Sequence, residues 1–298
     1  MYEQIARNKR RSAAIFFFFL LMIFLLAYAF GELTGMGTGG LIFAALIAGG
    51  LSFLSYWKSD SIVLAISRAK PVTKEEYPFL YNVVEGLAIA AGVPMPRCYI
   101  IDDTAPNAFA TGRDPAHSII CVTTGLLQKL NRVELEGVVA HEMSHIKNYD
   151  IRVQTLAVVM VGIIALLSDW IMRSLWWGGR GRRTSRSGKS GNAGSILLVV
   201  GIFFAIFGPL IAQLLRLAVS RRREFLADAS GAMLTRYPPG LASALRKISA
   251  DTEPLEAANK ATAHLYIVNP LKDLKGAVNK LFSTHPPIEE RIAALEKM

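Results

Sequence analysis

The chain has 298 residues with a formal net charge of +10, and 52% of its residues are hydrophobic, which gives a mean hydropathy of +0.35. This hydrophobic fraction is high for a soluble enzyme, so part of the chain is expected to lie in lipid. The basic residues cluster beside apolar segments, and no nucleic-acid motif accompanies them. The charge therefore predicts membrane-flanking segments and no nucleic-acid partner.

The first apolar segment covers residues 13–30 and follows four basic residues between positions 7 and 11. A basic stretch before an apolar run is typical of a signal peptide or of an uncleaved signal anchor. The length of the run favours the anchor, while an Ala-Tyr-Ala sequence at residues 27–29 leaves cleavage open. A second apolar run at residues 40–57 returns the chain to the side of the basic N-terminus, which is the cytoplasm by the positive-inside rule. Residues 1–58 are therefore expected to form a transmembrane hairpin.

Residues 59–154 are expected to form the first cytoplasmic part of a catalytic unit. Helical periodicity extends over residues 75–91, and Gly92 with two nearby prolines ends the helix. Three short β-like runs follow, and the turn residues between them predict a small sheet. The runs cover residues 97–101, 108–111 and 118–123.

The two cysteines, Cys98 and Cys121, each lie in one of these β-like runs. Neither belongs to a Cys-x-x-Cys or similar metal-ligand spacing. They are interpreted as buried core thiols rather than as a disulfide or a zinc pair, which fits a reducing compartment.

The second half of the chain contains two further apolar segments, residues 155–172 and 196–219. Between them, residues 178–194 are rich in Gly, Ser and Arg and lack an apolar period, which predicts a flexible basic loop. Residues 155–219 are therefore expected to form a second membrane hairpin. The remaining residues, 220–298, are expected to form the second part of the catalytic unit, with a last helix that a Pro-Pro pair opens.

The topology of the second hairpin contains a conflict. If both of its segments span the membrane, the basic loop lies outside the cell, against the positive-inside rule. The first segment also has a short unbroken apolar run that ends at Ser168 and Asp169, so it would be tilted, re-entrant or packed on its partners. Four spans are favoured, and an arrangement with two spans stays open.

A His-Glu-x-x-His sequence, formed by His141, Glu142 and His145, indicates the chemistry of the chain. Asn131 and Glu134 precede it in capping-box spacing, which predicts a helix that continues through the motif. On a helix, the two histidines lie on one face and can bind one metal ion. Zinc in such a site activates a water, from which Glu142 would take the proton as general base. The motif predicts a metalloprotease with one Zn²⁺ per chain.

A catalytic zinc needs a third protein ligand and an open fourth position. One family of zinc proteases places a Gly and then a His or Asp shortly after the motif, but Asn148 and Ile151 stand there, so that arrangement is excluded. Glu224 is the better candidate, with Asp228 four residues further along a predicted helix. Glu224 would bind zinc, and Asp228 would accept the free ring N–H of a zinc-binding histidine. Taken alone, this pair would also fit a solvated helix face beside arginines.

Four segments together resemble the HtpX family of heat-shock proteases, which are relatives of the CAAX prenyl proteases. They are residues 107–112, 141–145, 223–228 and 284–291, in this order, and the resemblance covers nearly the whole chain. The resemblance implies a mainly helical α+β membrane protein with transmembrane hairpins and a zincin-like (gluzincin) catalytic domain with a small β-sheet. It also implies a zinc endopeptidase of the prokaryotic inner membrane, facing the cytoplasm, that cleaves misfolded or selected membrane proteins in protein quality control. The same resemblance supports Glu224 as third ligand.

Three assignments carry less support from spacing. Asn107 and Ala108 lie on a predicted edge strand, and similar zinc proteases use an Asn-Ala pair to hold an extended substrate, although Asn107 also fits a turn after a proline. His285 would either donate to the oxyanion that forms on the attacked carbonyl or belong to the N-terminal cap of the last helix. The residues interpreted as structural are Asp150, His117 and His264.

Two other functions compete with that of a membrane-adjacent protease. An intramembrane protease would carry the motif inside a spanning helix. Here charged and polar residues flank the motif, and placing them in lipid would cost much free energy. These residues are Glu134, Glu136, Lys147, Asn148 and Asp150. A membrane-bound zinc-binding adaptor would not cut peptides and would have no use for Glu142, because a purely structural zinc site usually closes with four protein ligands.

Overall fold

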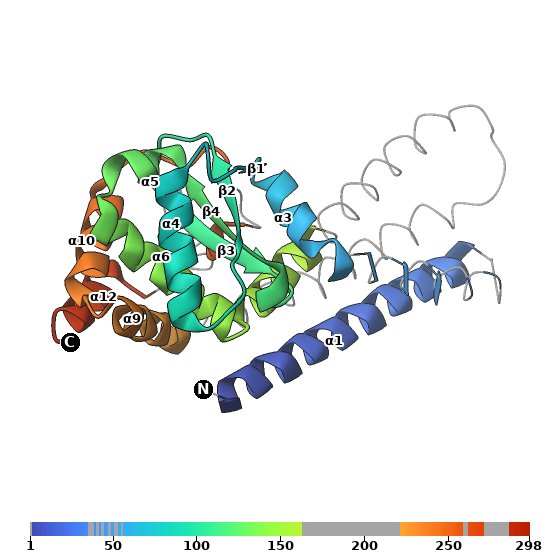
Figure 1. Ribbon diagram of the computed structural model, residues 1–298. Coiled ribbons are helices and arrows are strands. Elements are labelled where there is room, and N and C mark those ends of the chain that lie inside the picture. Colours follow the sequence, from blue (N-terminus) through green and yellow to red (C-terminus); the bar gives the residue numbers. More distant parts are fainter. Residues whose placement is uncertain are drawn as a thin grey trace.

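The computed structural model of the chain describes residues 2–34, 56–162, 221–258, 262–270 and 286–298, together with isolated positions between residues 39 and 54 (Figure 1). The predicted basic loop at residues 178–194, the apolar segment at residues 196–219 and much of the run at residues 40–57 lie outside the described residues. The second predicted hairpin is described only as far as residue 162.

The described part of the chain is mainly helical and contains one small sheet, as the sequence predicts. The helices are α1 (Tyr2–Thr34), α3 (Ser59–Ile66), α4 (Pro78–Ala91), α5 (Thr124–Lys129), α6 (Arg132–Lys147), α9 (Arg221–Thr235), α10 (Pro238–Ala250) and α12 (Ile288–Leu295). Two short 3-10 turns are η1 (Pro115–His117) and η2 (Ala263–Leu265), and residues 150–162 are also helical. The strands are β1 (Lys70–Pro71), β2 (Arg97–Ile101), β3 (Ala108–Gly112) and β4 (Ser118–Thr123).

The sheet has four strands in the order β1-β2-β4-β3, so β3 is an edge strand, as predicted. Strand β4 pairs in parallel with β2 and antiparallel with β3, while β1 pairs antiparallel with β2. The side chains of β3 and β4 are buried on both faces of the sheet, because helices cover one face and a loop with η2 and α3 covers the other. The sheet is therefore mixed and largely internal.

Cys98 and Cys121 are free, buried thiols that contribute to the cores on opposite faces of this sheet. Burial raises the pKa of Cys98 to about 12 and raises that of Cys121 well above its ordinary value. The interpretation of both as core thiols is confirmed, and a disulfide between them is excluded.

The sheet and helices α4, α5, α6, α9, α10 and α12 form one body (Figure 1). Helix α6 lies at its centre and packs most extensively against α9, α10 and α4. Two glycines let these helices approach closely. A Cβ at Gly137 would lie 2.7 Å from the backbone N of Leu241, and one at Gly231 would lie 3.0 Å from the backbone N of His141. The absence of side chains at these points brings α9 and α10 against the helix that carries the motif.

One predicted helix boundary shifts in the structure, while two others lie where the sequence predicts. The helix expected over residues 75–91 begins at Pro78, because the fixed φ of proline suits the first turn and Glu76 instead closes a local turn with Thr73. It ends at Gly92, whose φ of 69° lies in the left-handed region that favours glycine. The last helix begins at Ile288, directly after the Pro-Pro pair.

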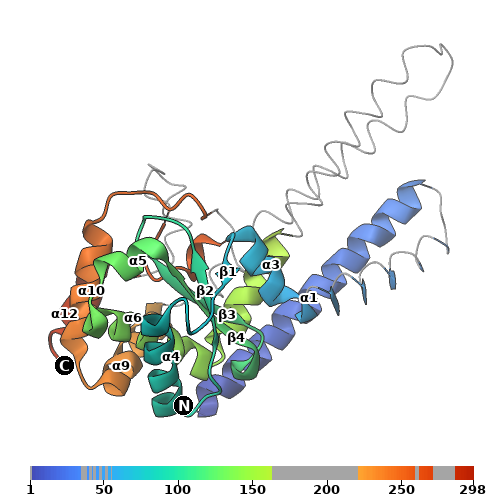
Figure 2. The ribbon, with the colours of Figure 1, turned by 45° about the horizontal axis from the view of Figure 1, so that its top comes forward.

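Helix α1 begins beside the body and projects away from it in both views (Figures 1 and 2). One face, with Ser12, Ile15, Phe19 and Ile23, is buried, while other large apolar side chains of the helix are exposed. The exposed ones are Phe17, Phe18, Leu21, Leu25 and Tyr28. No helix within the described ranges combines the length and the apolarity needed to cross a membrane.

We expect Gly137→Ala to lower the free energy of unfolding by about 1–3 kcal/mol, because the added methyl group would overpack the backbone contact between α6 and α10. Gly86→Ala is the matched control, since this helical glycine has nothing within 4 Å of its ideal Cβ and alanine is the better helix former. Urea unfolding in detergent measures both. An unchanged midpoint for Gly137→Ala would contradict the close packing.

Candidate metal centre

Helix α6 presents His141 and His145 on one face, because residues four apart on a helix project in nearly the same direction. The helix begins with the predicted capping box. The Asn131 side chain accepts a hydrogen bond from the backbone N–H of Glu134, and the Glu134 carboxylate accepts one from that of Asn131. Both histidine side chains are buried, with exposed fractions of 1% and 5%.

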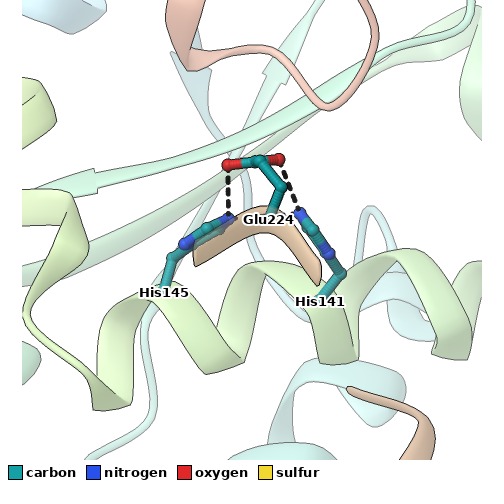
Figure 3. A group of neighbouring side chains, drawn as sticks. All are labelled: His141, His145 and Glu224. Atoms are coloured by element: carbon teal, nitrogen blue, oxygen red, sulfur yellow. Dashed lines mark hydrogen bonds and ion pairs between the residues drawn. The ribbon is translucent and has the colours of Figure 1, made fainter. Parts of the chain in front are cut away.

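Helix α9 brings Glu224 over these two histidines (Figure 3). The Nε2 atoms of His141 and His145 lie 3.1 Å apart, and the Glu224 carboxylate oxygens lie 3.7 Å from the first and 3.6 Å from the second. Figure 3 shows both rings directed from α6 toward the carboxylate, which lies across their tips with one oxygen facing each ring. The structure thus brings together the three residues that the sequence selected as metal ligands.

The three side chains fit a zinc ion in donor type and spacing. Imidazole nitrogen and carboxylate oxygen are both zinc ligands, with bond lengths of about 2.0–2.2 Å. Tetrahedral coordination at that length places ligand atoms about 3.3–3.5 Å apart, and the observed separations of 3.1, 3.6 and 3.7 Å lie on either side of that value. Three protein ligands leave a fourth position for water or substrate, as in catalytic zinc sites.

The other ring nitrogen of His141 faces Asp228. His141 Nδ1 lies 2.8 Å from Asp228 Oδ1, so its N–H donates to this carboxylate. Arg291 of α12 binds the same carboxylate through two nitrogens, at 2.8 and 2.6 Å, and the Arg291 side chain is fully buried. Burial alone would raise the pKa of Asp228, but the charge of Arg291 lowers it to about 2. This is the contact proposed for Asp228 from the sequence.

His145 has an equivalent carboxylate behind it, which sequence reasoning treated as structural. His145 Nδ1 lies 3.2 Å from Asp150 Oδ2, and Arg223 donates to Asp150 Oδ1 at 3.1 Å. Asp150 reaches the ring because the chain turns back after α6, with Tyr149 in the left-handed region at φ 60°. Such a conformation at a residue other than glycine costs on the order of 1 kcal/mol and persists where the surroundings impose it.

The two histidines differ in their electrostatic surroundings. Burial lowers the pKa of His141 to about 4, even though its partner Asp228 acts in the opposite direction. Burial also disfavours the charged form of His145, but the carboxylates of Asp150 and Glu224 outweigh it and raise its pKa to about 9. In the neutral form that a metal requires, each carboxylate holds the ring proton on Nδ1 and leaves the Nε2 lone pair directed toward the common centre.

Glu142 is 2% exposed and lies beside this centre. Burial raises the pKa of Glu142 to about 7; the charge of His145 opposes the rise, and that of Glu224 adds to it. The backbone N–H of Ala110 on β3 donates to the Glu142 carboxylate. A carboxyl group whose pKa lies near neutrality can both accept and return a proton at physiological pH, as general acid–base catalysis requires.

Asn107 and Ala108 lie at the start of β3, but their polar groups already bind the chain itself. The Asn107 amide donates to the Val268 carbonyl at 2.9 Å, and the Ala108 carbonyl accepts from Ile267 N–H at 2.9 Å. Arg291 also donates to the Ile267 carbonyl at 3.0 Å. In this conformation residues 267–268 cover the edge of β3 at these two residues, so the substrate contact expected for Asn107 stays a prediction.

The other residues named from the sequence lie elsewhere or outside the described ranges. His285 is among the residues that the structure does not describe. His117 is half exposed and bound to Asp114, and His264 is buried with Nε2 3.4 Å from the Gln154 carbonyl. Both agree with a structural role.

Asp150, Arg223 and Arg291 are the site residues whose contacts sequence reasoning did not anticipate. Asp150 offered one signal, since it is the first carboxylate after the motif and stands where the helix ends. The two arginines gave no such signal, because an arginine on a helix is usually exposed. The full burial of Arg291 depends on the packing of α12.

Comparison with known proteins links this site to a peptidase family. The model of peptidase family M48 matches residues 75–298. A protein named Protease HtpX homolog from Dictyoglomus turgidum is 53% identical over 297 residues, covering 100% of this chain and 94% of that protein. One from Thermoanaerobacter pseudethanolicus is 47% identical over 299 residues, covering 100% and 98%. The crystal structure of S. mikatae Ste24p has a TM-score of 0.51 at 18% identity, covering 99% of this chain and 67% of that one, and shows a likeness of fold alone.

We expect one Zn²⁺ per chain, with Glu224→Ala weakening its binding most. Asp228→Ala should weaken it by a smaller factor of roughly 10–100, because Asp228 acts through His141. His117→Ala is the control and should leave binding unchanged. Competition with a chromophoric chelator measures the dissociation constants. A larger loss for Asp228→Ala than for Glu224→Ala would reverse the two assignments.

Proposed function

The chain belongs to peptidase family M48, which makes it a metalloendopeptidase, and on that premise we propose that it is a zinc-dependent endopeptidase of a prokaryotic cytoplasmic membrane. Its substrates are misfolded or selected membrane proteins, and its active site faces the cytoplasm. The observation that carries the zinc assignment is the convergence of His141, His145 and Glu224 in one buried group.

In this proposal the three ligands hold one zinc ion, which when bound lowers the pKa of a water and polarises the carbonyl of the peptide bond. Glu142 acts as the general base. Its carboxylate would take the proton of the attacking water and later return it to the leaving amine. Asp228 and Asp150 keep the two histidines in the orientation that directs Nε2 to the metal.

Strand β3 is the proposed binding strand for an extended substrate. It is an edge strand, and its Ala110 N–H reaches Glu142, so a peptide beside it would lie at the metal centre. A role for Asn107 and Ala108 requires that residues 267–268 give way to the substrate backbone. His285 stays a proposed donor to the oxyanion, or part of the cap of the last helix.

The membrane location rests on the sequence and on the exposed apolar side chains of the N-terminal part. Beyond the exposed side chains of α1, several others up to residue 57 are 47–70% exposed. They are Ile42, Leu46, Phe53, Leu54 and Trp57. An apolar surface of this kind is typical of a contact with lipid or with another protein. Substrates drawn from the same membrane would reach a site on the body beside it.

We expect Glu142→Gln to retain one zinc per chain and to lower peptide hydrolysis by a factor on the order of 10²–10⁴, because it keeps the ligands and removes the base. The matched control is Glu136→Gln on the same helix, where the carboxylate only pairs with Arg132 at the surface. Cleavage of an unfolded membrane protein in detergent, with zinc analysis of each sample, measures both. Unchanged hydrolysis by Glu142→Gln would exclude Glu142 as the base, and absence of hydrolysis in the parent chain would favour the zinc-binding adaptor.

The proposed four-span topology is tested at residue 187, in the predicted basic loop. A Ser187→Cys chain should react with a membrane-impermeant thiol reagent added to intact cells. The parent chain is the control, because its two cysteines are buried and the pKa of each is raised. Reaction of Ser187→Cys only after the cytoplasm is opened would replace four spans by two.

A further inference from the structure

The N-terminal helix α1 contacts the body next to the end of the motif helix (Figure 2). The contact is made by Asn8, which is 3% exposed although it lies between basic residues near the start of the chain. Burial of an amide costs free energy unless its donors and acceptor find partners. The partners of Asn8 therefore indicate why it lies inside.

Asn8 uses its side-chain nitrogen for two hydrogen bonds at the metal site. Nδ2 donates to the carbonyl of Asn148, which is the C-cap residue of α6, at 2.9 Å. It also donates to Oδ1 of Asp150 at 2.8 Å. An amide nitrogen carries two hydrogens, so these two bonds use both. One residue of α1 thus holds both the end of the motif helix and the carboxylate that binds His145.

We propose that Asn8 is a positioning residue of the peptidase centre, acting on His145 through Asp150, so that α1 forms part of the metal site. The inference rests on the proposed zinc function. Asp150 has two oxygens with separate tasks, since Oδ2 faces His145 Nδ1 while Oδ1 accepts from Asn8 and Arg223. Bonds to Oδ1 fix the rotation of the carboxylate, and that rotation decides where Oδ2 holds the imidazole.

Asn8 contacts a carboxylate that binds a histidine, and in this it differs from the rest of the buried face of α1. Ser12, one helical turn further on, is 1% exposed, and its hydroxyl has no hydrogen-bond partner. Further along, the buried face is apolar, with Ile15, Phe19 and Ile23. Lys9, next to Asn8, lies over the ring of Tyr149 at 4.5 Å and holds the same turn. Among these residues, only Asn8 binds Asp150, the carboxylate that contacts His145.

The inference is tested by zinc affinity in full-length variants, measured by chelator competition on metal-free protein. We expect Asn8→Ala to weaken zinc binding about 5- to 10-fold, the low end of the effect of groups that orient metal ligands. Asn8→Leu keeps the branched shape and the number of side-chain heavy atoms but removes the donors, so it should show the same loss without a cavity. Ser12→Ala, on the same face, is the control and should bind zinc as the parent does.

A double-mutant cycle with Asp150→Ala separates positioning from general stabilisation. If Asn8 acts through Asp150, Asn8→Ala should change zinc affinity by less than about twofold once Asp150 is gone. The absorption spectrum of the cobalt-substituted protein should also shift in Asn8→Ala and not in Ser12→Ala. Equal losses in both backgrounds, or lower unfolding midpoints with unchanged zinc affinity, would overturn the inference. Absence of zinc binding in the parent would instead overturn the proposed function.

Discussion

The rest of the structure depends on the need to keep charged groups paired in the interior around His141 and His145. Both rings and the carboxylates of Glu142 and Glu224 lie at most 5% exposed, where an unpaired charge costs several kcal/mol. The chain meets this need with one carboxylate behind each ring and at least one positively charged group behind each carboxylate. The partners are Asp228 with Arg291, and Asp150 with Arg223.

These partners come from segments far apart in the sequence, so the site forms only when the whole body assembles. Helix α9 supplies Glu224, Asp228 and Arg223, while the C-terminal helix α12 supplies Arg291. Close packing against α6 is what places them, and the glycines at 137 and 231 set the separation of the helices. These packing contacts place the three proposed ligands at distances that suit one zinc ion.

The N-terminal helix connects the proposed membrane anchor to the chemistry. It carries exposed apolar side chains between residues 17 and 28, yet near its start Asn8 binds Asp150. A helix held by lipid on one side and by the metal site on the other would constrain how the body faces the membrane. In this view the anchor has a second task, because the same element that positions the enzyme also stabilises one end of α6.

The sequence by itself determined the local features, and it did so because each depends on residues close together in the chain. The capping box of Asn131 and Glu134, the shared face of His141 and His145, and the Glu224 and Asp228 pair all follow from helical spacing. The order of the motifs then indicated the family. Edge position of β3 and burial of both cysteines were also predictable from short patterns.

Only the tertiary structure decided which distant side chains complete the site. No spacing rule connects Asn8 with Asp150, or Arg291 with Asp228, because these contacts depend on how helices pack and not on position along one helix. The hydrogen bond from Asn107 to the Val268 carbonyl also depends on tertiary packing, since it requires a loop to lie against the edge of β3. A buried charge needs a partner of opposite charge, and this can be expected from the sequence. Which residue becomes the partner depends on how the helices pack.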